Sequence, residues 1–292
     1  MEFSRLVDVL RNIPRDDLAV VVISTFSLDP AKMGSLLTSA RLDPTITRIF
    51  HHRHSRGRNH DAMYELLNTF RWLREAERYF HYRFVLALYE NNRPCHFAIY
   101  AQNVNKFYTR PRELIYRGTP HGLDTLTKEM ARLLRSGAFS RRDAALARRL
   151  DHVRFTPNDD RLIVQRPRHT TLVQLEALAR ANTRTAIHAY APYQSDELDV
   201  CEHIADALVT PGTGVTVHVA EPSVEHGFDL GAFVTFRNRL LYTTHNLTEA
   251  SWIGARTLEI SVLTSHVPRS VREAVRSRMR RSRRIHVQVS EC

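Results

Sequence analysis

Lysine, cysteine and long apolar runs are all scarce in this sequence. Only three of its 42 lysine and arginine residues are lysines, and its three cysteines, Cys95, Cys201 and Cys292, lie far apart. Cysteines this few and this widely spaced indicate a reducing compartment and do not have the spacing of a zinc site. No uncharged apolar run approaches the roughly 18 residues of a membrane-spanning helix. The sequence therefore predicts neither a membrane span nor a structural zinc site.

The first residues also lack the form of a secretory signal. Residues 1–5 lead into charged, amphipathic sequence rather than into an apolar core followed by a cleavage site. Together with the few cysteines, this predicts an intracellular protein of the nucleus or the cytoplasm that is not secreted.

The charge of the chain is strongly positive. Its formal net charge is +11 and its sequence pI is about 10.0, and 39 of its basic residues are arginines. Guanidinium groups contact phosphate in a bidentate manner and stay charged at any ordinary pH. The composition therefore favours a polyanionic partner, nucleic acid before an anionic membrane. The alternative is a solvated basic surface produced by an arginine-rich coding bias.

The chain has two halves that share an order of predicted elements. Apolar spacing predicts a helix, a short apolar strand, a second helix and a second strand in each half. In the first half these elements are expected at 5–13, 18–26, from 31 onward and at 46–51. In the second half they are expected at 171–182, 185–190, from 195 onward and at 214–220.

Each half then ends in a predicted β-hairpin. The first hairpin has strands at 81–89 and 95–103, and the second has strands at 231–236 and 240–246. Both returning strands finish at an asparagine, Asn103 and Asn246. The matching order of strand, helix, strand and hairpin predicts a duplicated α/β unit. An additional helix is expected at 61–79 in the first copy only.

The duplication suggests four segments. Residues 1–122 form the first half, 123–168 a helical connection, 169–268 the second half and 269–292 an arginine-rich C-terminal segment. The connection is predicted to hold basic helices at 123–136 and 141–153, followed by a short strand between 154 and 168. No low-complexity linker separates the halves, so we expect them to pack into one body.

The hairpins carry the strongest similarity to a known family. Residues 241–252 read LYTTHNLTEASW, and a glutamate-led strand, Glu259-Ile-Ser-Val, follows soon after. The first half offers a weaker counterpart at 98–104. These segments resemble the phospholipase D superfamily, and within it the tyrosyl-DNA phosphodiesterases. The resemblance implies an α/β fold of two pseudo-twofold-related halves, with mixed β-sheets flanked by helices.

The chemistry implied by the resemblance needs two His-x-Lys motifs, one in each half. One histidine attacks phosphorus, and the other protonates the leaving group and then activates water. Lysines and asparagines stabilise charge on the phosphoryl oxygens. No metal or other cofactor is implied.

This chain departs from that pattern in both halves. The first half has His81-Tyr82-Arg83, in which arginine stands where the family has lysine. The second half has no equivalent at the start of its hairpin, and its nearest histidine, His226, comes several residues too early and is followed by glycine and phenylalanine. No His-x-Lys occurs anywhere in the sequence. Two-histidine chemistry is therefore expected to be incomplete.

The matching positions give the candidate site residues. His81 and, only in an active enzyme, His226 are the candidate catalytic groups. Arg83, Asn103 and Asn246 are expected to bind phosphate, and Glu259 is expected to support Asn246 or its neighbours. The plainer interpretation makes His81 a structural histidine and the asparagines ordinary strand-end residues.

Two further clusters need an interpretation. In His51-His52-Arg53-His54, neighbouring side chains on a strand point to opposite faces, so only His52 and His54 could share a metal, and none is expected. The helix predicted at 270–284 is dense in arginine. A surface that docks nucleic acid or a protein, or else a solvated face, is expected at its arginines, Arg272, Arg276, Arg280, Arg281, Arg283 and Arg284.

The favoured hypothesis is a catalytically inactive phospholipase D-fold protein. It would bind nucleic acid, or a protein partner in a larger assembly, through a basic cleft and surface. The alternative is an active, metal-independent phosphodiesterase or nuclease that uses His81 and a non-standard second site, either His226 or the first-half motif of a second copy in a homodimer. A third hypothesis is a virion-type protein that retains the fold as a scaffold.

Overall fold

The computed structural model describes most of the first half of the chain and the strands of the second. The described residues are 1–52, 73–76, 80–90, 93–100, 113–139, 142–166, 170–171, 173, 187–191, 214–219, 232–236, 239–244 and 257–288. The chain divides into two compact units, one holding residues 2–159 and the other most of residues 160–292. No helix in the described part of the chain is both long and apolar enough to cross a membrane.

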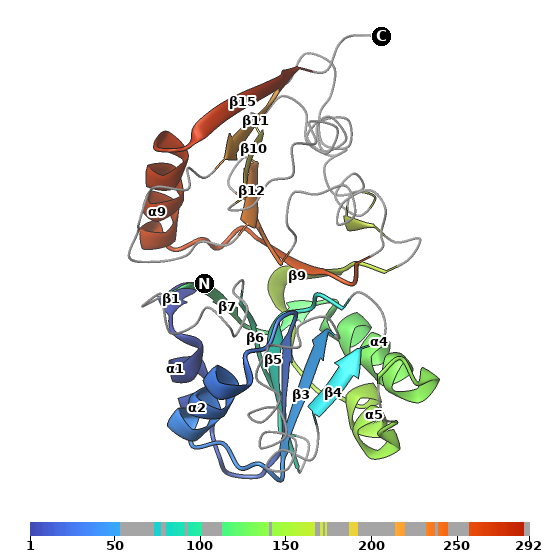
Figure 1. Ribbon diagram of the computed structural model, residues 1–292. Coiled ribbons are helices and arrows are strands. Elements are labelled where there is room, and N and C mark those ends of the chain that lie inside the picture. Colours follow the sequence, from blue (N-terminus) through green and yellow to red (C-terminus); the bar gives the residue numbers. More distant parts are fainter. Residues whose placement is uncertain are drawn as a thin grey trace. The chain divides into compact units, whose positions relative to one another are not determined.

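The first unit is built on a seven-stranded mixed sheet (Figure 1). The strands follow the order β1-β7-β6-β5-β2-β3-β4, and β2, β3 and β4 run parallel while the other pairs are antiparallel. Their bounds are β1 Glu2–Ser4, β2 Leu18–Thr25, β3 Thr47–His52, β4 Leu73–Ala76, β5 Phe84–Tyr89, β6 His96–Tyr100 and β7 Glu113–Arg117. The central strands β2 and β5 are apolar because both of their faces are covered.

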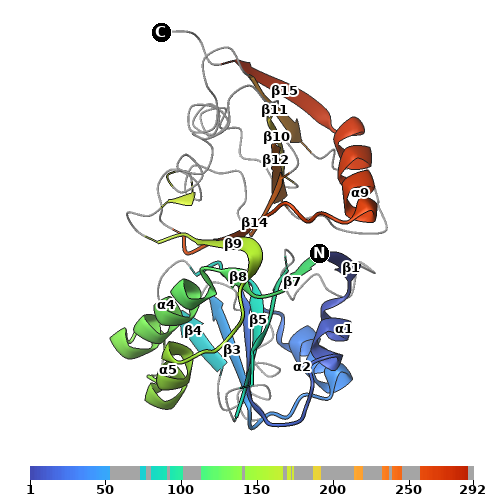
Figure 2. The same cartoon turned by 180° about the vertical axis from the view of Figure 1, so that it is seen from behind.

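Helices cover both faces of this sheet (Figures 1 and 2). On one face lie α1 (Leu6–Arg11) and α2 (Pro30–Ala40), and on the other lie α4 (Leu123–Ser136) and α5 (Ala144–Asp151). The helix α2 begins where Asp29 caps the amide of Lys32, with proline at its first position, and it ends at Arg41 in the left-handed conformation. Glycines with positive φ bound α4 at both ends.

The second sheet has eight strands in the order β15-β11-β10-β12-β13-β14-β9-β8. Strands β10 and β11 run parallel to each other. Each neighbouring pair in the series β10, β12, β13, β14, β9 is antiparallel, and so is the pair of β11 and β15. The helix α9 (Arg269–Arg280) connects β14 to β15. The strand bounds are β8 Pro120–His121, β9 Asn158–Val164, β10 Ile187–Ala191, β11 Gly214–Val219, β12 Ala232–Phe236, β13 Arg239–Thr243, β14 Ile260–Thr264 and β15 Arg283–Gln288.

The two sheets contain the same five-stranded arrangement. In the first, β3 runs parallel to β2, and β5, β6 and β7 follow on the other side with antiparallel pairing throughout. In the second, β11 runs parallel to β10, and β12, β13 and β14 follow in the same way. The predicted α/β class with mixed sheets flanked by helices is confirmed, and the repeated strand order supports the internal duplication.

Three local predictions were wrong. The strand expected from 81 begins at Phe84, so the segment from His81 to Arg83 precedes β5. Part of the helix expected at 61–79 is the strand β4, and the rest of that range lies outside the described residues. The helix expected at 270–284 ends at Arg280, and Arg283 begins β15. Each of the two ranges wrongly predicted as helix contains an edge strand, which pairs with one neighbour only. Charged residues are tolerated on edge strands.

Candidate functional site

Three of the predicted site residues lie in the described part of the chain and three do not. His81 and Arg83 immediately precede β5, and Glu259 immediately precedes β14. His226, Asn103 and Asn246 lie outside the described residues.

His81 and Arg83 contact each other directly. Arg83 Nη2 lies 2.7 Å from His81 Nε2, and both side chains are buried, with exposed fractions of 5% and 3%. A guanidinium group has donors and no acceptor, so Arg83 donates this hydrogen bond and Nε2 accepts it. His81 is therefore a neutral imidazole that carries its proton on Nδ1, and its Nε2 lone pair points at the guanidinium group.

Phe26 holds the His81 ring in place. Its ring meets His81 edge-on at a centroid distance of 4.4 Å and stacks on His52 at 5.2 Å. His52 is buried and His51 Nδ1 lies 3.1 Å from the carbonyl oxygen of His52. The first two histidines of the predicted cluster therefore pack inside the fold, and His54 lies outside the described residues. Across the described ranges, no group of three histidine, cysteine or acidic side chains is placed to hold a metal ion.

Tyr100 lies close to Arg83. It is completely buried at the end of β6, and its hydroxyl donates to the carbonyl oxygen of Ser24, whose own hydroxyl donates to the carbonyl of Tyr82 at 2.7 Å. Burial raises the pKa of Tyr100, a hydrogen bond with Thr25 lowers it, and the nearby charges of Glu113 and Arg83 raise and lower it respectively. The phenol therefore stays protonated beside a buried cation and a buried carboxylate.

Glu113 is a site residue that the sequence analysis missed. It is the first residue of β7 and is only 2% exposed. Ile115, two residues later, pairs with Tyr100 of β6. In the second half, Glu259 likewise precedes by two residues Ser261, which pairs with Thr243. The available signal was a glutamate at the start of the strand that follows each hairpin. The two carboxylates occupy equivalent register positions.

In the second half, hydroxyl groups form hydrogen bonds at and near the buried carboxylate. Glu259 is completely buried, and its Oε2 accepts a hydrogen bond from Thr244 Oγ1 at 2.7 Å. Ser261 donates to Thr243 Oγ1, also at 2.7 Å. The strand β12, which corresponds to β5, begins at Ala232 and contains neither histidine nor lysine. Among the described residues, Glu259 thus contacts Thr244, two residues before Asn246.

Comparison with known proteins gives matches in structure only. No protein-family model and no curated protein sequence matches the chain. A mutant of yeast tyrosyl-DNA phosphodiesterase matches with a TM-score of 0.54 and 12% identity over 87% of this chain and 84% of its own. Phosphatidylserine synthase from Haemophilus influenzae matches with a TM-score of 0.60 and 11% identity over 96% of this chain and 84% of its own.

A polyphosphate kinase from Porphyromonas gingivalis also matches, with a TM-score of 0.56 and 12% identity over 94% of this chain and 44% of its own. All three proteins are members of the phospholipase D superfamily. The chain has the phospholipase D fold. At these identities the likeness establishes the fold and leaves the activity to the site residues.

Within this phospholipase D fold, the two halves differ in the groups beside the hairpin. The first half carries an imidazole, a guanidinium group and a carboxylate in His81, Arg83 and Glu113. The second half has a carboxylate and hydroxyl groups in its described residues. An imidazole that accepts a hydrogen bond from a guanidinium group can bind an anion together with it once the two separate. It cannot attack phosphorus while its lone pair is occupied.

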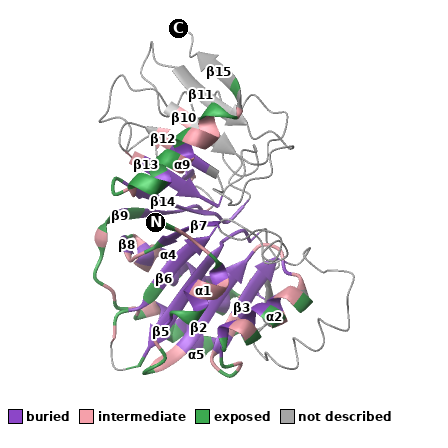
Figure 3. Ribbon diagram, turned by 90° about the vertical axis from the view of Figure 1, so that its left-hand side faces the viewer, coloured by how far each residue is buried: buried purple, intermediate pink, exposed green. Residues whose placement is uncertain are grey.

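The arginines of the C-terminal segment lie on two elements of this fold. Arg272, Arg276 and Arg280 are exposed along α9, which is green and pink on its outer side in Figure 3. Arg281 follows the helix and Arg284 lies on β15, and both are exposed. The side chain of Arg283 lies outside the described residues. On the opposite side of α9, Val271 and Val275 are buried.

Proposed function

We propose that this protein binds nucleic acid through its basic surface and does not cleave phosphodiester bonds. The observation that carries the loss of catalysis is the contact between Arg83 and His81 Nε2. Nε2 is the only ring nitrogen of this neutral imidazole with a lone pair, and the guanidinium group occupies it. Attack on phosphorus would require Arg83 to leave a buried position.

The second half supports the same conclusion. A covalent phosphohistidine needs a second group to protonate the leaving oxygen and to activate water. The residues that lead into β12, Leu230-Gly231-Ala232, include no histidine, although the resemblance requires one before this strand. The sequence therefore supplies no histidine at the position of the second catalytic group.

The exposed face of α9 supports nucleic acid as the partner. Arg272, Arg276 and Arg280 are four residues apart, so they project from one face at intervals of about 6 Å along the helix axis. Within the described residues none of the three has an acidic partner. Planar guanidinium groups in such a row fit the phosphates of a nucleic-acid backbone.

The same arginines work against the stability of α9. Like charges four residues apart destabilise a helix by about 0.2–0.5 kcal/mol for each pair. The first turn of α9 has no acidic residue and no side-chain cap, so Arg272 also faces the positive end of the helix dipole. A polyanion relieves both effects, which a merely solvated face would leave in place.

An anionic membrane fits this face less well. A helix that lies on a membrane needs an exposed apolar side, and the apolar residues of α9, Val271 and Val275, are buried. Among the described residues, Val173 is the only large hydrophobic side chain that is mostly exposed. The described surface is therefore cationic without an apolar patch.

A cleavage assay tests the loss of catalysis. Wild type, His81→Ala and Arg83→Lys would be incubated with labelled single-stranded and duplex oligonucleotides and with a chromogenic phosphodiester. We expect all three proteins to give the same rate as the buffer blank. Cleavage by the wild type that His81→Ala abolishes would overturn the proposal and would favour the active enzyme with His81 as nucleophile.

A salt titration tests the nucleic-acid contact. Replacing Arg272, Arg276 and Arg280 together by glutamine should lower the slope of log K against log salt by about 2.7 for duplex DNA. The matched control replaces Arg142, Arg148 and Arg161, which are also exposed, and removes the same charge elsewhere. Equal effects of the two triple variants would mean that net charge alone drives binding.

A further inference from the structure

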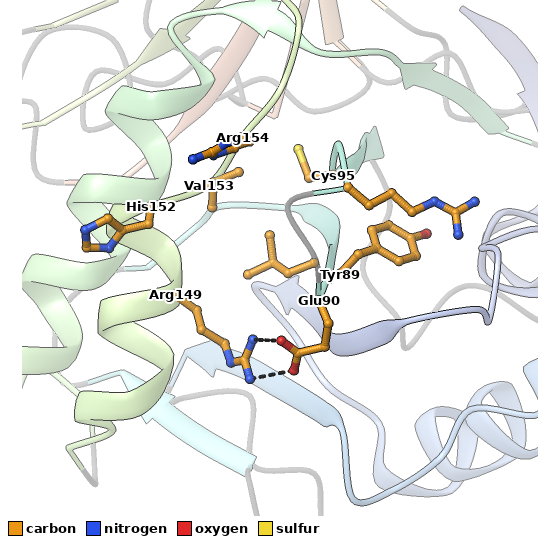
Figure 4. A pocket seen from close by; sticks show the side chains of 9 residues that line it. Tyr89, Glu90, Cys95, Arg149, His152, Val153 and Arg154 are labelled. Carbon is orange, nitrogen blue, oxygen red and sulfur yellow. Dashed lines mark hydrogen bonds and ion pairs between the residues drawn. The ribbon is translucent and has the colours of Figure 1, made fainter.

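A pocket of about 190 Å³ lies in the first unit at the opposite end of β5 from His81. Nine side chains line it, from the end of β5, the hairpin turn, the start of β6, and α5 with the segment that follows it (Figure 4). Because β5 extends from Phe84 to Tyr89, at about 3.4 Å per residue the pocket is ~17 Å along the strand from the His81 end. It is therefore separate from the histidine site.

One side of the pocket holds a complete ion pair. Arg149 of α5 donates to both carboxylate oxygens of Glu90, at 2.7 and 3.1 Å (Figure 4). The hydrogen bonds from Arg149 lower the pKa of Glu90. The only acidic side chain that lines the pocket is therefore ionised at neutral pH and already neutralised by one arginine.

Two more arginines line the pocket without a carboxylate of their own. Arg93 donates to the carbonyl oxygen of Asp16 at 3.1 Å, and its guanidinium carbon lies 4.9 Å from the centre of the Tyr89 ring. These contacts hold its position and use one of its five N–H groups. Arg154 makes no ion pair and no side-chain hydrogen bond with the described residues. The pocket thus has an excess of two positive charges, before any contribution from His152.

The inner wall of the pocket is apolar. It includes Leu88, Val153 and Cys95, and burial raises the pKa of the Cys95 thiol to about 12, so the thiol is neutral. The hydroxyl of Tyr89 lies 2.9 Å from His96 Nδ1 and is engaged there. An apolar wall next to positively charged groups lowers the local dielectric constant, which strengthens the attraction between those groups and an anion.

His152 adds a polar group at the rim. Its Nδ1 lies 2.8 Å from the carbonyl oxygen of Arg148, which only accepts, so Nδ1 carries a proton and Nε2 is left for another partner. Nε2 can accept a hydrogen bond from a hydroxyl group of a ligand.

From these observations we propose that the pocket binds a small phosphate monoester. The phosphate contacts Arg154 at a rim that also carries the charges of Arg93 and Arg149, and the ester group rests on the apolar wall. The volume is below the roughly 300–1,000 Å³ of pockets for drug-sized ligands, and it corresponds to about six waters at ~30 Å³ each. A large cofactor is therefore excluded. This site is independent of the proposed nucleic-acid binding by α9.

Calorimetric titration of the full chain tests this site. The probes are inorganic phosphate, adenosine monophosphate, and one oligonucleotide with either a 5′-phosphate or a 5′-hydroxyl end. Binding of adenosine monophosphate identifies a free ester as the ligand. Binding only of the 5′-phosphorylated oligonucleotide, in preference to its 5′-hydroxyl form, identifies a nucleic-acid end. No binding of any phosphate monoester at millimolar concentration would overturn the proposal.

Two variants and a control locate the binding. Arg154→Gln should weaken binding of the monoester at least tenfold, and Glu90→Gln, which releases Arg149, should tighten it severalfold. Arg148→Gln removes an exposed arginine of α5 that does not line the pocket and should leave the affinity within twofold. Equal losses in Arg154→Gln and Arg148→Gln would overturn the proposal. The α9 triple variant should bind the monoester like wild type, which keeps this test separate from that of the proposed function.

Discussion

The two hairpins of this protein share their strand order and pairing and differ in their side chains. In the first half Tyr100 pairs with Ile115, and a buried glutamate lies two residues before Ile115. In the second half Thr243 pairs with Ser261, and a buried glutamate again lies two residues before the paired residue. The first half has His81 and Arg83 before β5, whereas the residues that lead into β12, Leu230-Gly231-Ala232, include neither a histidine nor a basic residue.

With the proposed loss of catalysis, this difference identifies the buried glutamate as the part of the site that both halves retain. A buried carboxylate must be hydrogen-bonded, and removing its partners is costly. Glu259 has such a partner in Thr244, so we expect the fold to depend on this carboxylate. We infer that the acid remained because it became structural.

The largest expected effect compares the paired residues themselves. Tyr100→Ala removes a completely buried ring and should lower the free energy of unfolding by about 3–5 kcal/mol. Thr243→Ala removes one methyl group and one hydroxyl acceptor, and should cost about 1–2 kcal/mol. Urea denaturation of both variants measures the difference. Equal costs would mean that the two positions are equally packed and would break the comparison.

A second pair of variants compares the hydroxyl groups. Thr244→Val removes the hydrogen bond that the buried carboxylate of Glu259 accepts. The free energy of unfolding should fall by about 1.5–3 kcal/mol, because hydrogen bonds to charged groups are stronger than neutral ones. Ser24→Ala removes a neutral hydrogen bond to the Tyr82 carbonyl and should cost about 0.5–1.5 kcal/mol. If Thr244→Val were the milder change, Glu259 would not depend on Thr244.

The smallest expected effect is at the turn of the first hairpin. The Glu90–Arg149 pair is about half exposed, so Glu90→Gln should cost below about 1 kcal/mol at neutral pH. Because Arg149 lowers the pKa of Glu90, this contribution is present above the unfolded-state pKa and is lost as the pH falls through the folded-state pKa. Wild type and Glu90→Gln should therefore converge in stability in acid, as measured by thermal unfolding between neutral pH and pH ~3. A difference that grows in acid would contradict this.

The sequence predicts much of the fold because the central strands are apolar runs. The strand expected at 18–26 is β2, and the strands expected at 46–51 and 214–220 are β3 and β11, each within one residue at either end. Two of the three errors fall on β4 and β15, which are edge strands that contain charged residues. Their stability comes from one neighbouring strand, which local periodicity does not report.

The site could be predicted from the sequence only in part. His81, Arg83 and Glu259 follow from the motif, and the structure describes their contacts. Glu113 was missed although a glutamate precedes the matching strand of the second half, because its position close to Tyr100 depends on the register of β6 against β7. The hydrogen bond between Arg83 and His81 was also beyond the sequence, since it depends on both side chains being buried together before β5. Asn103, Asn246 and His226 stay predictions.

The position of β15 has a practical consequence. This strand pairs with β11 along six residues and lies at one edge of the second sheet. A truncation after α9 would leave the backbone N–H and C=O groups of β11 without their partners in β15. It would thereby create an exposed strand edge that can pair with another copy of the chain. Shortened forms of the chain that retain α9 but lack 283–288 should therefore self-associate through β11, and fusion tags are better joined beyond residue 288.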